Sequence, residues 1–400
     1  MFFSNKPTVS TDSAKIEELL TRSVVEVIPS KDALKKVLVS GKRLRIKLGI
    51  DPTSPNIHIG RSVALLKLKD FQDLGHQLVS IVGDFTGVIG DTSDKDAERP
   101  MLTNDVIETN KAKYFEQAGK VINTKTAELR YNSTWLGELT YREIGEQADQ
   151  FSVADFISRE LIKKRLDEGK RVSLREMLYP LMQGYDSVAI KADVEIGGTD
   201  QRFNMLAGRV LQKHFGQPEQ FVLILGPLLP GTDGRKMSSS WGNTINLAEE
   251  PKEMFGKIMS IPDTLIRDYL IHTTRLPLGD VERIVNGHPK DAKGALAKEL
   301  VRMYHGEKAA DAAQADFDKA FVKNEAPENI QEVKSLGTLR DTLVKNAIIA
   351  SNSEFARLAV GKAIHKVSGA FEIKIIDANA PAPVGTVFRI GKHRFVKIIG

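Results

Sequence analysis

Two short segments of this chain carry residue types suited to holding a nucleotide. The first, Asp-Pro-Thr-Ser-Pro-Asn-Ile-His-Ile-Gly, spans residues 51–60, and the second, Lys-Met-Ser, spans residues 236–238. A histidine and a glycine at a helix start, with a lysine on a distant loop, can hold the phosphates of ATP while a carboxylate attacks the α-phosphate. Either segment alone is weak evidence, because the first can simply begin a helix and the second can simply be a solvated loop. Together they favour adenylate-forming chemistry.

The first segment lies between a predicted strand and a predicted helix. Residues 44–50 alternate in polarity with the period of a strand, and apolar residues recur near helical spacing over 63–74. We therefore expect the His-x-Gly turn at a helix N-terminus, which favours an anion. Gly60 would allow close approach of a nucleotide, and His58 would donate to phosphate oxygens. The alternative is a buried histidine bonded to a carbonyl.

Further apolar runs predict the rest of the catalytic fold. Residues 78–83 and 221–225 have the length of buried strands, and residues 201–214 suit a helix after a Gly-Gly-Thr-Asp loop. Strands interleaved with helices predict an α/β fold with a Rossmann-like parallel sheet covered on both faces. Ligands bind beyond the carboxyl ends of the strands in such sheets, which is where the motifs are expected.

A longer series of motifs extends this pattern. In chain order it comprises Asp51-Pro-Thr with His58-Ile-Gly, Gly87-Val-Ile-Gly-Asp91 with Glu98-Arg99, Asn132 with Trp135, Tyr179-Pro-Leu-Met-Gln183-Gly-Tyr-Asp186, Gly197-Gly-Thr-Asp-Gln201 and Lys236-Met-Ser238. From about Leu44 to the C-terminus the chain resembles a bacterial-type tyrosyl-tRNA synthetase, a class I aminoacyl-tRNA synthetase. The resemblance implies activation of L-tyrosine with ATP to tyrosyl-adenylate and pyrophosphate, then transfer of the tyrosyl group to the 3′ end of tRNA(Tyr). Such chemistry relies on positioning and electrostatics rather than on an enzyme nucleophile.

The resemblance also implies roles for individual residues. The expected catalytic residues are Thr53, His58 and Lys236. The expected ATP contacts are Asp51, Gly60, Arg61, Lys95, Arg99, Gly198, Asp200, Lys236, Ser238 and Ser239. The expected tyrosine contacts are Gly49, Asp91, Tyr179, Gln183, Asp186 and Gln201. ATP is expected with Mg²⁺, and no tightly bound, protein-ligated metal is expected.

Simpler readings remain for some of these residues. Lys95 and Arg99 could be surface charges of an ordinary acidic-basic helix start. Tyr179, Gln183 and Asp186 could be a polar stripe, because their spacing puts them on one helix face. As a hydrogen-bond acceptor for the phenol, Asp186 would reject phenylalanine, an effect for which this enzyme family is the standard example.

Three positions depart from the family pattern. Arg61 stands where the first motif usually ends in histidine, and it would either place a positive charge near the nucleotide or point to solvent. Ser239 stands where a second lysine is common, which removes one triphosphate cation. Lys47 stands where a tyrosine often contacts the phenol, so recognition would depend more on Asp186. Glycines and serines around Lys236 indicate a loose loop.

Composition and charge bound the answer further. Four hundred residues predict two or three domains, and the absence of cysteine excludes thiolate catalysis and disulfides. We expect a cytoplasmic protein without a signal peptide or membrane span. The net charge of +5 is carried by residues 351–400, which hold eight Lys and Arg against three Asp and Glu. A basic terminal module on a neutral body predicts binding to a polyanion.

The C-terminal segment carries its own fold signals. Ser351 to Glu354 has the sequence of a capping box, and strand-like runs cover residues 371–376, 386–390 and 391–398. The segment resembles the small RNA-binding domain shared with a ribosomal small-subunit protein, although Phe355 and Ala359 replace more polar residues. The expected tRNA contacts are Arg357, Lys362, Lys366, Lys392, Arg394 and Lys397.

The expected organisation has three domains. Residues 1–228 form the catalytic domain, residues 229–335 the Lys-Met-Ser loop and a helical anticodon-binding domain, and residues 338–400 the small RNA-binding domain, with a linker within 321–337. The resemblance implies a homodimer. The alternatives are a tryptophanyl-tRNA synthetase, a small-molecule nucleotidyltransferase, and a non-catalytic RNA-binding derivative of a synthetase.

Overall fold

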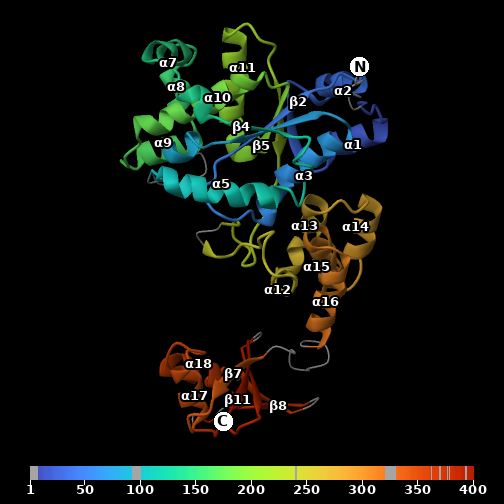
Figure 1. Cartoon of the computed structure of the whole chain (residues 1–400), viewed down its shortest axis with the longest axis vertical. Coiled ribbons are helices and arrows are strands. Elements are labelled where there is room, and N and C mark those ends of the chain that lie inside the picture. Colours follow the sequence, from blue (N-terminus) through green and yellow to red (C-terminus); the bar gives the residue numbers. More distant parts are fainter. Residues whose placement is uncertain are drawn as a thin grey trace. The chain divides into compact units, whose positions relative to one another are not determined.

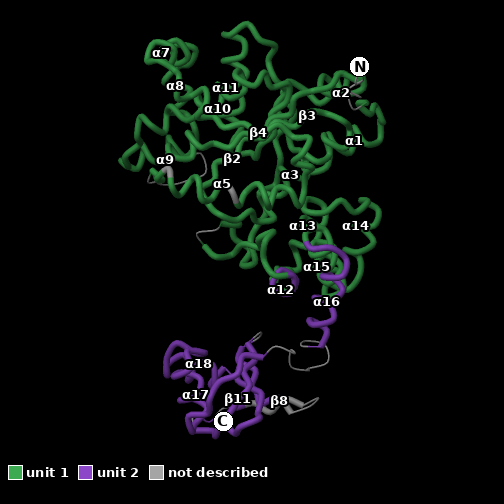
Figure 2. Tube along the Cα trace, viewed as in Figure 1, with its two compact units in different colours: residues 1–250, 257–304 green, residues 251–256, 305–400 purple. Residues whose placement is uncertain are grey.

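The structure is a computed structural model that falls into two compact units. One unit comprises residues 1–250 and 257–304, and the other comprises residues 251–256 and 305–400 (Figure 2). No helix in the part of the chain described here is long and apolar enough to cross a membrane. The described residues are 8–91, 101–238, 241–319, 330–361, 363–368, 371–375, 377, 379–391 and 394–400.

The first unit is built on a sheet with the strand order β1-β6-β5-β2-β3-β4 over the described residues (Figure 1). β1 pairs antiparallel with β6, whereas the other neighbours pair in parallel. The predicted strands 44–50, 78–83 and 221–225 are β2, β3 and β6, so the Rossmann-like α/β prediction is confirmed. The strands are β1 Val24–Ile28, β2 Arg45–Ile50, β3 Gln77–Val82, β4 Glu128–Tyr131, β5 Val194–Gly198 and β6 Phe221–Leu225.

Helices pack on this sheet and follow it in the chain. α3 packs on β2, β3 and β5, while α11 packs on β5 and β6 and lies along α10. The helices up to β6 are α1 Ser13–Thr21, α2 Lys31–Val39, α3 Ile59–Asp73, α4 Thr86–Ile89, α5 Asn104–Ala118, α6 Ser133–Leu136, α7 Tyr141–Ala148, α8 Val153–Ile157, α9 Glu160–Asp167, α10 Leu174–Ile190, the 3-10 turn η1 Thr199–Gln201 and α11 Arg202–His214. Those that follow are α12 Pro251–Met259, the 3-10 turn η3 Asp263–Leu265, α13 Ile266–Thr273, α14 Leu278–Val285 and α15 Pro289–His305.

The connectivity defines where a ligand should bind. From β2 the chain moves outward to β3 and β4, whereas β5 and β6 lie on the other side of β2. The strand order therefore reverses between β2 and β5, and open α/β sheets bind ligands at the carboxyl ends of such strands. Asp51 follows β2 directly, and Gly198 is the last residue of β5.

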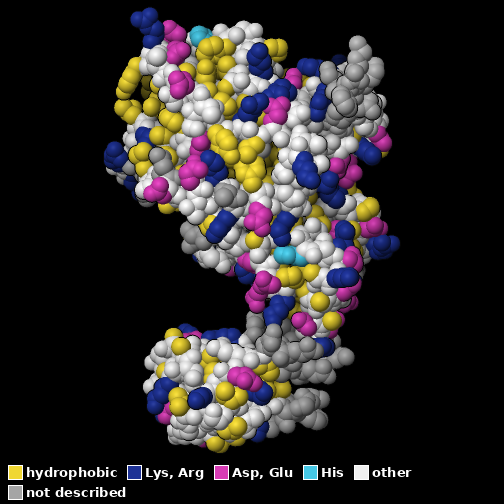
Figure 3. All heavy atoms as spheres, viewed as in Figure 1, with side chains coloured by type: hydrophobic (Ala, Val, Ile, Leu, Met, Phe, Trp, Pro, Cys, Tyr) yellow, Lys and Arg dark blue, Asp and Glu magenta, His cyan; other side chains and the backbone are white. Residues whose placement is uncertain are grey.

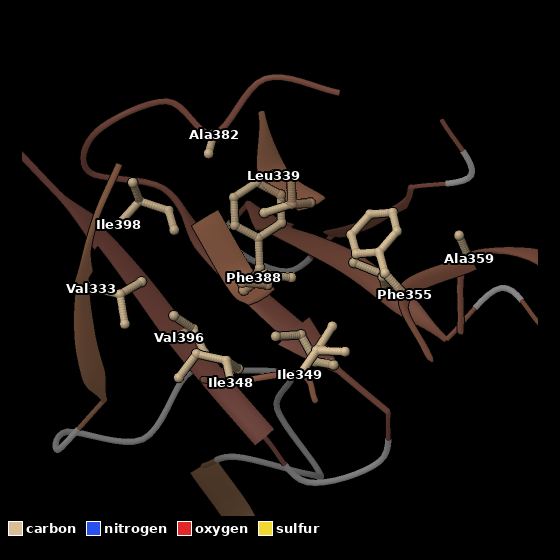
Figure 4. Packing of buried hydrophobic residues seen from close by; sticks show 13 residues of the cluster. Val333, Leu339, Ile348, Ile349, Phe355, Ala359, Ala382, Phe388, Val396 and Ile398 are labelled. Atoms are coloured by element: carbon tan, nitrogen blue, oxygen red, sulfur yellow. The ribbon is translucent and has the colours of Figure 1, made fainter. Parts of the chain in front are cut away.

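The second unit contains a small sheet with the strand order β7-β11-β10-β8-β9 over the described residues. Its core includes Phe355, Phe388, Leu339 and Ile398 (Figure 4). Phe355 and Ala359, which depart from the family pattern, are buried on the core side of α18. The elements are α16 Glu307–Phe317, β7 Gln331–Lys334, α17 Leu339–Lys345, α18 Asn352–Val360, β8 Ile364–Ser368, β9 Phe371–Lys374, β10 Val387–Ile390 and β11 Arg394–Ile399.

Two details of this unit differ from the sequence prediction. β7 falls within the predicted linker 321–337, yet it pairs in parallel with β11 and is an edge strand of the sheet; its short length and polar composition hid it. Ser351 caps α18 as expected, by accepting from the backbone N–H of Glu354. The Glu354 carboxylate, however, accepts from the N–H of Ala350 rather than of Ser351.

Candidate active site

His58 caps α3, the helix of the first motif. Its Nδ1 accepts a hydrogen bond from the backbone N–H of Arg61 at 3.3 Å, so the proton of the neutral ring lies on Nε2, which can donate. The side chain is buried, and the pKa of His58 falls to about 3, first because of burial and then because Arg61 and Lys236 place positive charges nearby. His58 is therefore neutral at pH 7, and it caps a backbone N–H instead of bonding a carbonyl.

The Lys-Met-Ser segment lies against this turn. Sδ of Met237 would be 3.5 Å from a β-carbon built on Gly60, and Nδ1 of His58 would be 3.1 Å from it. His58 also forms a β-bridge with Asn246, a few residues beyond the loop. Lys236 is near enough to lower the pKa of His58. The two motifs, far apart in the sequence, thus meet at the start of α3.

One asparagine holds the described part of this loop. Oδ1 of Asn243 accepts from the N–H of Ser238 at 2.8 Å, and its Nδ2 donates to Asp233 at 2.8 Å and to the carbonyl of Lys236 at 3.1 Å. A β-carbon on Gly231 would lie 2.6 Å from Nδ2 of Asn243, so only glycine fits there. The sequence indicates a loose loop, but these bonds tie its two sides together.

Arg61 points neither freely to solvent nor away from the motif. Its guanidinium donates to the hydroxyl of Tyr114 on α5 at 2.9 Å, and its charge contributes to the low pKa of His58. The arginine therefore places a fixed positive charge beside the His-x-Gly turn.

Asp51, at the end of β2, is bonded through both carboxylate oxygens. The Tyr179 hydroxyl donates to Oδ2 at 2.8 Å, and the Thr86 hydroxyl donates to Oδ1 at 2.7 Å. Burial and the Asp51 charge raise the pKa of Tyr179 well above its usual value. A β-carbon on Gly83 would lie 2.0 Å from Oδ1 of Asp51, so a glycine at the end of β3 allows this arrangement. Thr53 follows two residues later, and its N–H donates to the carbonyl of Asp51.

Asp186, on α10, is buried and bound by two neutral donors. Nε1 of Trp135 donates to Oδ1 at 2.8 Å, and Nδ2 of Asn132 donates to Oδ2 at 3.3 Å. Burial raises the pKa of Asp186 to about 7, while the nearby charge of Lys47 and the two hydrogen bonds oppose the rise. Asn132 also donates to the Thr86 hydroxyl at 2.9 Å, which connects Asp186 to the Asp51 cluster.

The two glutamines predicted to contact tyrosine are each bonded to carboxylates. Nε2 of Gln201 donates to Asp91 at 2.7 Å and to Asp200 at 3.2 Å. Nε2 of Gln183 donates to Glu195 on β5 at 3.1 Å. On α10, Tyr179 and Gln183 therefore contact residues of the two strands between which the strand order reverses, Asp51 directly after β2 and Glu195 on β5.

Lys47 and Glu195 form a fully buried ion pair beneath these residues. They are register partners on β2 and β5, their side chains are 0% and 2% exposed, and Nζ lies 2.9 Å from Oε1. Nζ also donates to the carbonyl of Gln183 and to the hydroxyl of Ser187, each at 2.7 Å. An ammonium group has three donors, and these acceptors take all of them.

Glycines leave room at the ends of the two central strands. Gly49 shares a face of β2 with Lys47, and a β-carbon there would meet no atom within 4 Å. On β5, a β-carbon at Gly198 would lie 2.6 Å from a carboxylate oxygen of Asp200. Ser238 is fixed through its backbone by Asn243.

Several predicted residues lie outside the described part of the chain or in the second unit. Lys95, Arg99, Ser239, Lys362 and Lys392 lie outside the described residues. In the second unit, Arg394 donates to the carbonyl of Ile348 and pairs with Glu354, and Lys397 pairs with Glu332. Arg357 is exposed and Lys366 is partly buried. On the face that Figure 3 shows, Lys and Arg side chains are scattered over this unit.

Sequence reasoning missed several residues that shape the site. Asn132 and Trp135 stand in a motif that indicates no role for them. No motif contains Thr86, Gly83, Glu195 or Asn243, although Gly83 ends a predicted strand and Asn243 follows the serine-rich loop. The described residues contain no cluster of three or more His, Cys, Asp or Glu arranged to hold a metal ion.

The chain is similar to known proteins over nearly its whole length. Residues 40–322 match the family model for tRNA synthetases class I (W and Y). A tyrosine–tRNA ligase of Carboxydothermus hydrogenoformans is 43% identical, with 96% of this chain and 97% of that protein covered. Tyrosine–tRNA ligase 2 of Vibrio vulnificus is 42% identical, with 96% and 99% covered.

Solved structures show the same fold. A C-terminally truncated mitochondrial tyrosyl-tRNA synthetase of Aspergillus nidulans aligns with a TM-score of 0.65 at 22% identity, over 77% of this chain and 94% of that one. A tyrosyl-tRNA synthetase of Archaeoglobus fulgidus, in complex with L-tyrosine, aligns with a TM-score of 0.58 at 23% identity, over 75% and 99%. From the family match and the nearly full-length relatives together, this chain belongs to the tyrosyl-tRNA synthetases within the class I tRNA synthetases.

Proposed function

We propose that the site at the ends of β2 and β5 carries out the reaction of this family. The protein is a tyrosine–tRNA ligase, which joins L-tyrosine to its tRNA at the expense of ATP. The observation that carries the site assignment is the meeting of His58, Gly60 and the Lys236 loop at the N-terminus of α3. A helix N-terminus with a neutral donor and a nearby lysine ammonium is suited to a transferring phosphoryl group.

On this proposal the tyrosine carboxylate attacks the α-phosphate of ATP and pyrophosphate leaves. Nε2–H of His58 and the Lys236 ammonium stabilise charge that develops on the phosphate oxygens, assisted by Arg61 and Thr53. Mg²⁺ enters with the triphosphate as part of the substrate. A terminal ribose hydroxyl of the tRNA then takes the tyrosyl group from the adenylate. Arg61 compensates in part for the cation that is lost at position 239.

The tyrosine side of the site lies toward α10. We assign Asp91, Tyr179, Gln183 and Gln201 to the substrate ammonium and carboxylate, Asp186 to the phenol, and Asp51 to ATP. Asp186 is held by donors from Trp135 and Asn132, so its remaining lone pairs can accept from a phenol hydroxyl. A ligand without that hydroxyl would leave a buried carboxylate poorly satisfied, which rejects phenylalanine.

The remaining parts of the proposal concern the whole molecule. We propose a cytoplasmic homodimer, a catalytic domain over residues 1–228, a helical anticodon-binding domain over 229–335, and a tRNA-binding module over 338–400, to whose sheet β7 also belongs. The basic residues of that module, with Arg357 and Lys366 as described examples, would contact phosphates of the tRNA.

The test is exchange of labelled pyrophosphate into ATP, measured with each amino acid in turn. We expect exchange with tyrosine and none above background with phenylalanine or tryptophan. Lys236→Ala should lower the exchange rate at least tenfold, whereas removal of residues 351–400 should spare exchange and impair tRNA charging. Exchange driven by tryptophan, or no exchange by folded protein, would contradict the proposal.

A further inference from the structure

Asn204, on α11, donates to both glutamines of the tyrosine site. Its Nδ2 lies 3.1 Å from Oε1 of Gln183 and 3.2 Å from Oε1 of Gln201. The residue is 1% exposed. An amide nitrogen carries two hydrogens, so one side chain can supply one hydrogen to each glutamine oxygen. Asn204 therefore joins two residues that α10 and η1 bring from different parts of the sequence.

The amide nitrogens of the two glutamines donate to carboxylates. The nitrogen of Gln183 donates to Glu195, and the nitrogen of Gln201 donates to Asp91 and Asp200. An ionised carboxylate accepts and cannot donate. With an acceptor at one end and the Asn204 donor at the other, each glutamine amide has one favourable orientation.

The amide of Asn204 itself is held at a cost. Among the described residues its Oδ1 has no hydrogen-bond partner, and an unpaired buried polar atom costs about 1–3 kcal/mol. Turning the amide over would aim Oδ1 at two glutamine oxygens and leave those oxygens without a donor. An apolar side chain would avoid the unpaired atom altogether. Asn204 thus stabilises the orientation of Gln183 and Gln201 and does not improve the packing of the core around it.

We propose that Asn204 is a positioning residue for tyrosine binding. It fixes the amides of Gln183 and Gln201 so that each presents its oxygen to the α-ammonium group of the substrate. The inference rests on the proposed assignment of both glutamines to tyrosine. It predicts that Asn204 affects tyrosine binding through the glutamines and leaves ATP binding alone.

Steady-state pyrophosphate exchange by Asn204→Asp and Asn204→Ala tests this. Aspartate has nearly the same shape but sets an acceptor against two glutamine oxygens, and we expect its KM for tyrosine to rise at least tenfold, which corresponds to about 1.4 kcal/mol. Alanine should raise KM for tyrosine about threefold to tenfold. KM for ATP should stay within about twofold in both variants. Gln212→Glu, another buried amide on the same helix, is the control, and its KM for tyrosine should be unchanged.

A double-mutant cycle with Gln183→Ala separates positioning from general disturbance. If Asn204 acts through the glutamines, Asn204→Ala should have a clearly smaller effect on KM for tyrosine when Gln183 is already alanine. Full additivity, an unchanged KM for tyrosine, or equal rises in KM for tyrosine and ATP would overturn the inference. An unchanged KM in Gln183→Ala alone would instead overturn the assignment of the site. Because alanine needs no buried charge, this arm remains informative if the aspartate variant does not fold.

Discussion

The buried pair of Lys47 and Glu195 gives the sharpest quantitative prediction. Lys47→Met removes the ammonium but keeps the length of the side chain. It leaves the carbonyl of Gln183, the hydroxyl of Ser187 and a buried carboxylate without their donor. Breaking a buried pair from one side typically costs about 3–5 kcal/mol. Glu195 keeps donors from Gln183, Ser187 and Gln220, so we expect the lower end, about 3 kcal/mol of unfolding free energy.

The double variant Lys47→Met with Glu195→Gln measures the coupling. It contains no buried charge at this place, and neutral replacements of buried pairs are often close to neutral in stability. We therefore expect the double variant to be more stable than Lys47→Met by about 2 kcal/mol in guanidinium-induced unfolding at pH 7. Lys42→Met, which breaks the exposed pair with Asp193, should cost less than about 1 kcal/mol. A Lys47→Met variant within 1 kcal/mol of the parent, or strictly additive effects, would refute the reasoning.

Three further results are expected. By NMR, the His58 ring should not titrate above about pH 4. Because the unfolded chain binds this proton from about pH 6.5 downward, the free energy of unfolding should fall as the pH falls, by about 2 kcal/mol at pH 5 from this group. A midpoint near pH 6.5 in the folded protein would contradict the burial of His58. Asp186 is the opposite case, because its pKa is raised to about 7 and its ionisation lowers stability as the pH rises from about 4 to 7. The variant Asp186→Asn should therefore raise Tm more at pH 8 than at pH 5, and it should abolish tyrosine-dependent exchange. An equal Tm shift at both pH values would contradict the raised pKa. Asn243→Ala should lower kcat for exchange about tenfold or more and leave KM for tyrosine unchanged, because three hydrogen bonds of the loop are lost. Asn123→Ala, which loses only an exposed turn contact, is the control. Parent-like kinetics for Asn243→Ala would show that the loop does not need this residue.

The sequence predicts the catalytic fold because its signals are local. The alternation over 44–50 and the apolar runs over 78–83 and 221–225 each mark a strand, and β2, β3 and β6 lie there. The sequence does not predict β7, because this exposed edge strand of four residues has only one buried side chain, Val333. A short polar edge strand has no alternation of apolar and polar residues that would distinguish it from a linker.

The site was predictable in its residue types but not in its connections. His58, Asp51 and Asp186 stand in motifs, yet nothing local to them specifies Thr86, Asn132 or Glu195 as partners, because these come from other strands and helices. The burial that sets the pKa of Asp186 depends on the packing of α10 against the sheet. Lys47 reads as a departure at a substrate-contacting position, and only the neighbouring strand shows that its charge is neutralised by Glu195.

The hydrogen bonds from Asp186 through Asn132 and Thr86 to Asp51 have a fixed direction. Asn132 can only donate through Nδ2, so the Thr86 hydroxyl accepts from it and must point its own hydrogen at Asp51. A group that displaces the Asp51 carboxylate would leave the hydroxyl hydrogen of Thr86 without its acceptor. The hydroxyl could not donate to the Asn132 amide nitrogen instead, because that nitrogen is itself a donor. Asn132 thus donates both to Asp186 on the tyrosine side and, by way of Thr86, toward Asp51 on the ATP side, so a ligand that moves either carboxylate disturbs the hydrogen bonds of the other.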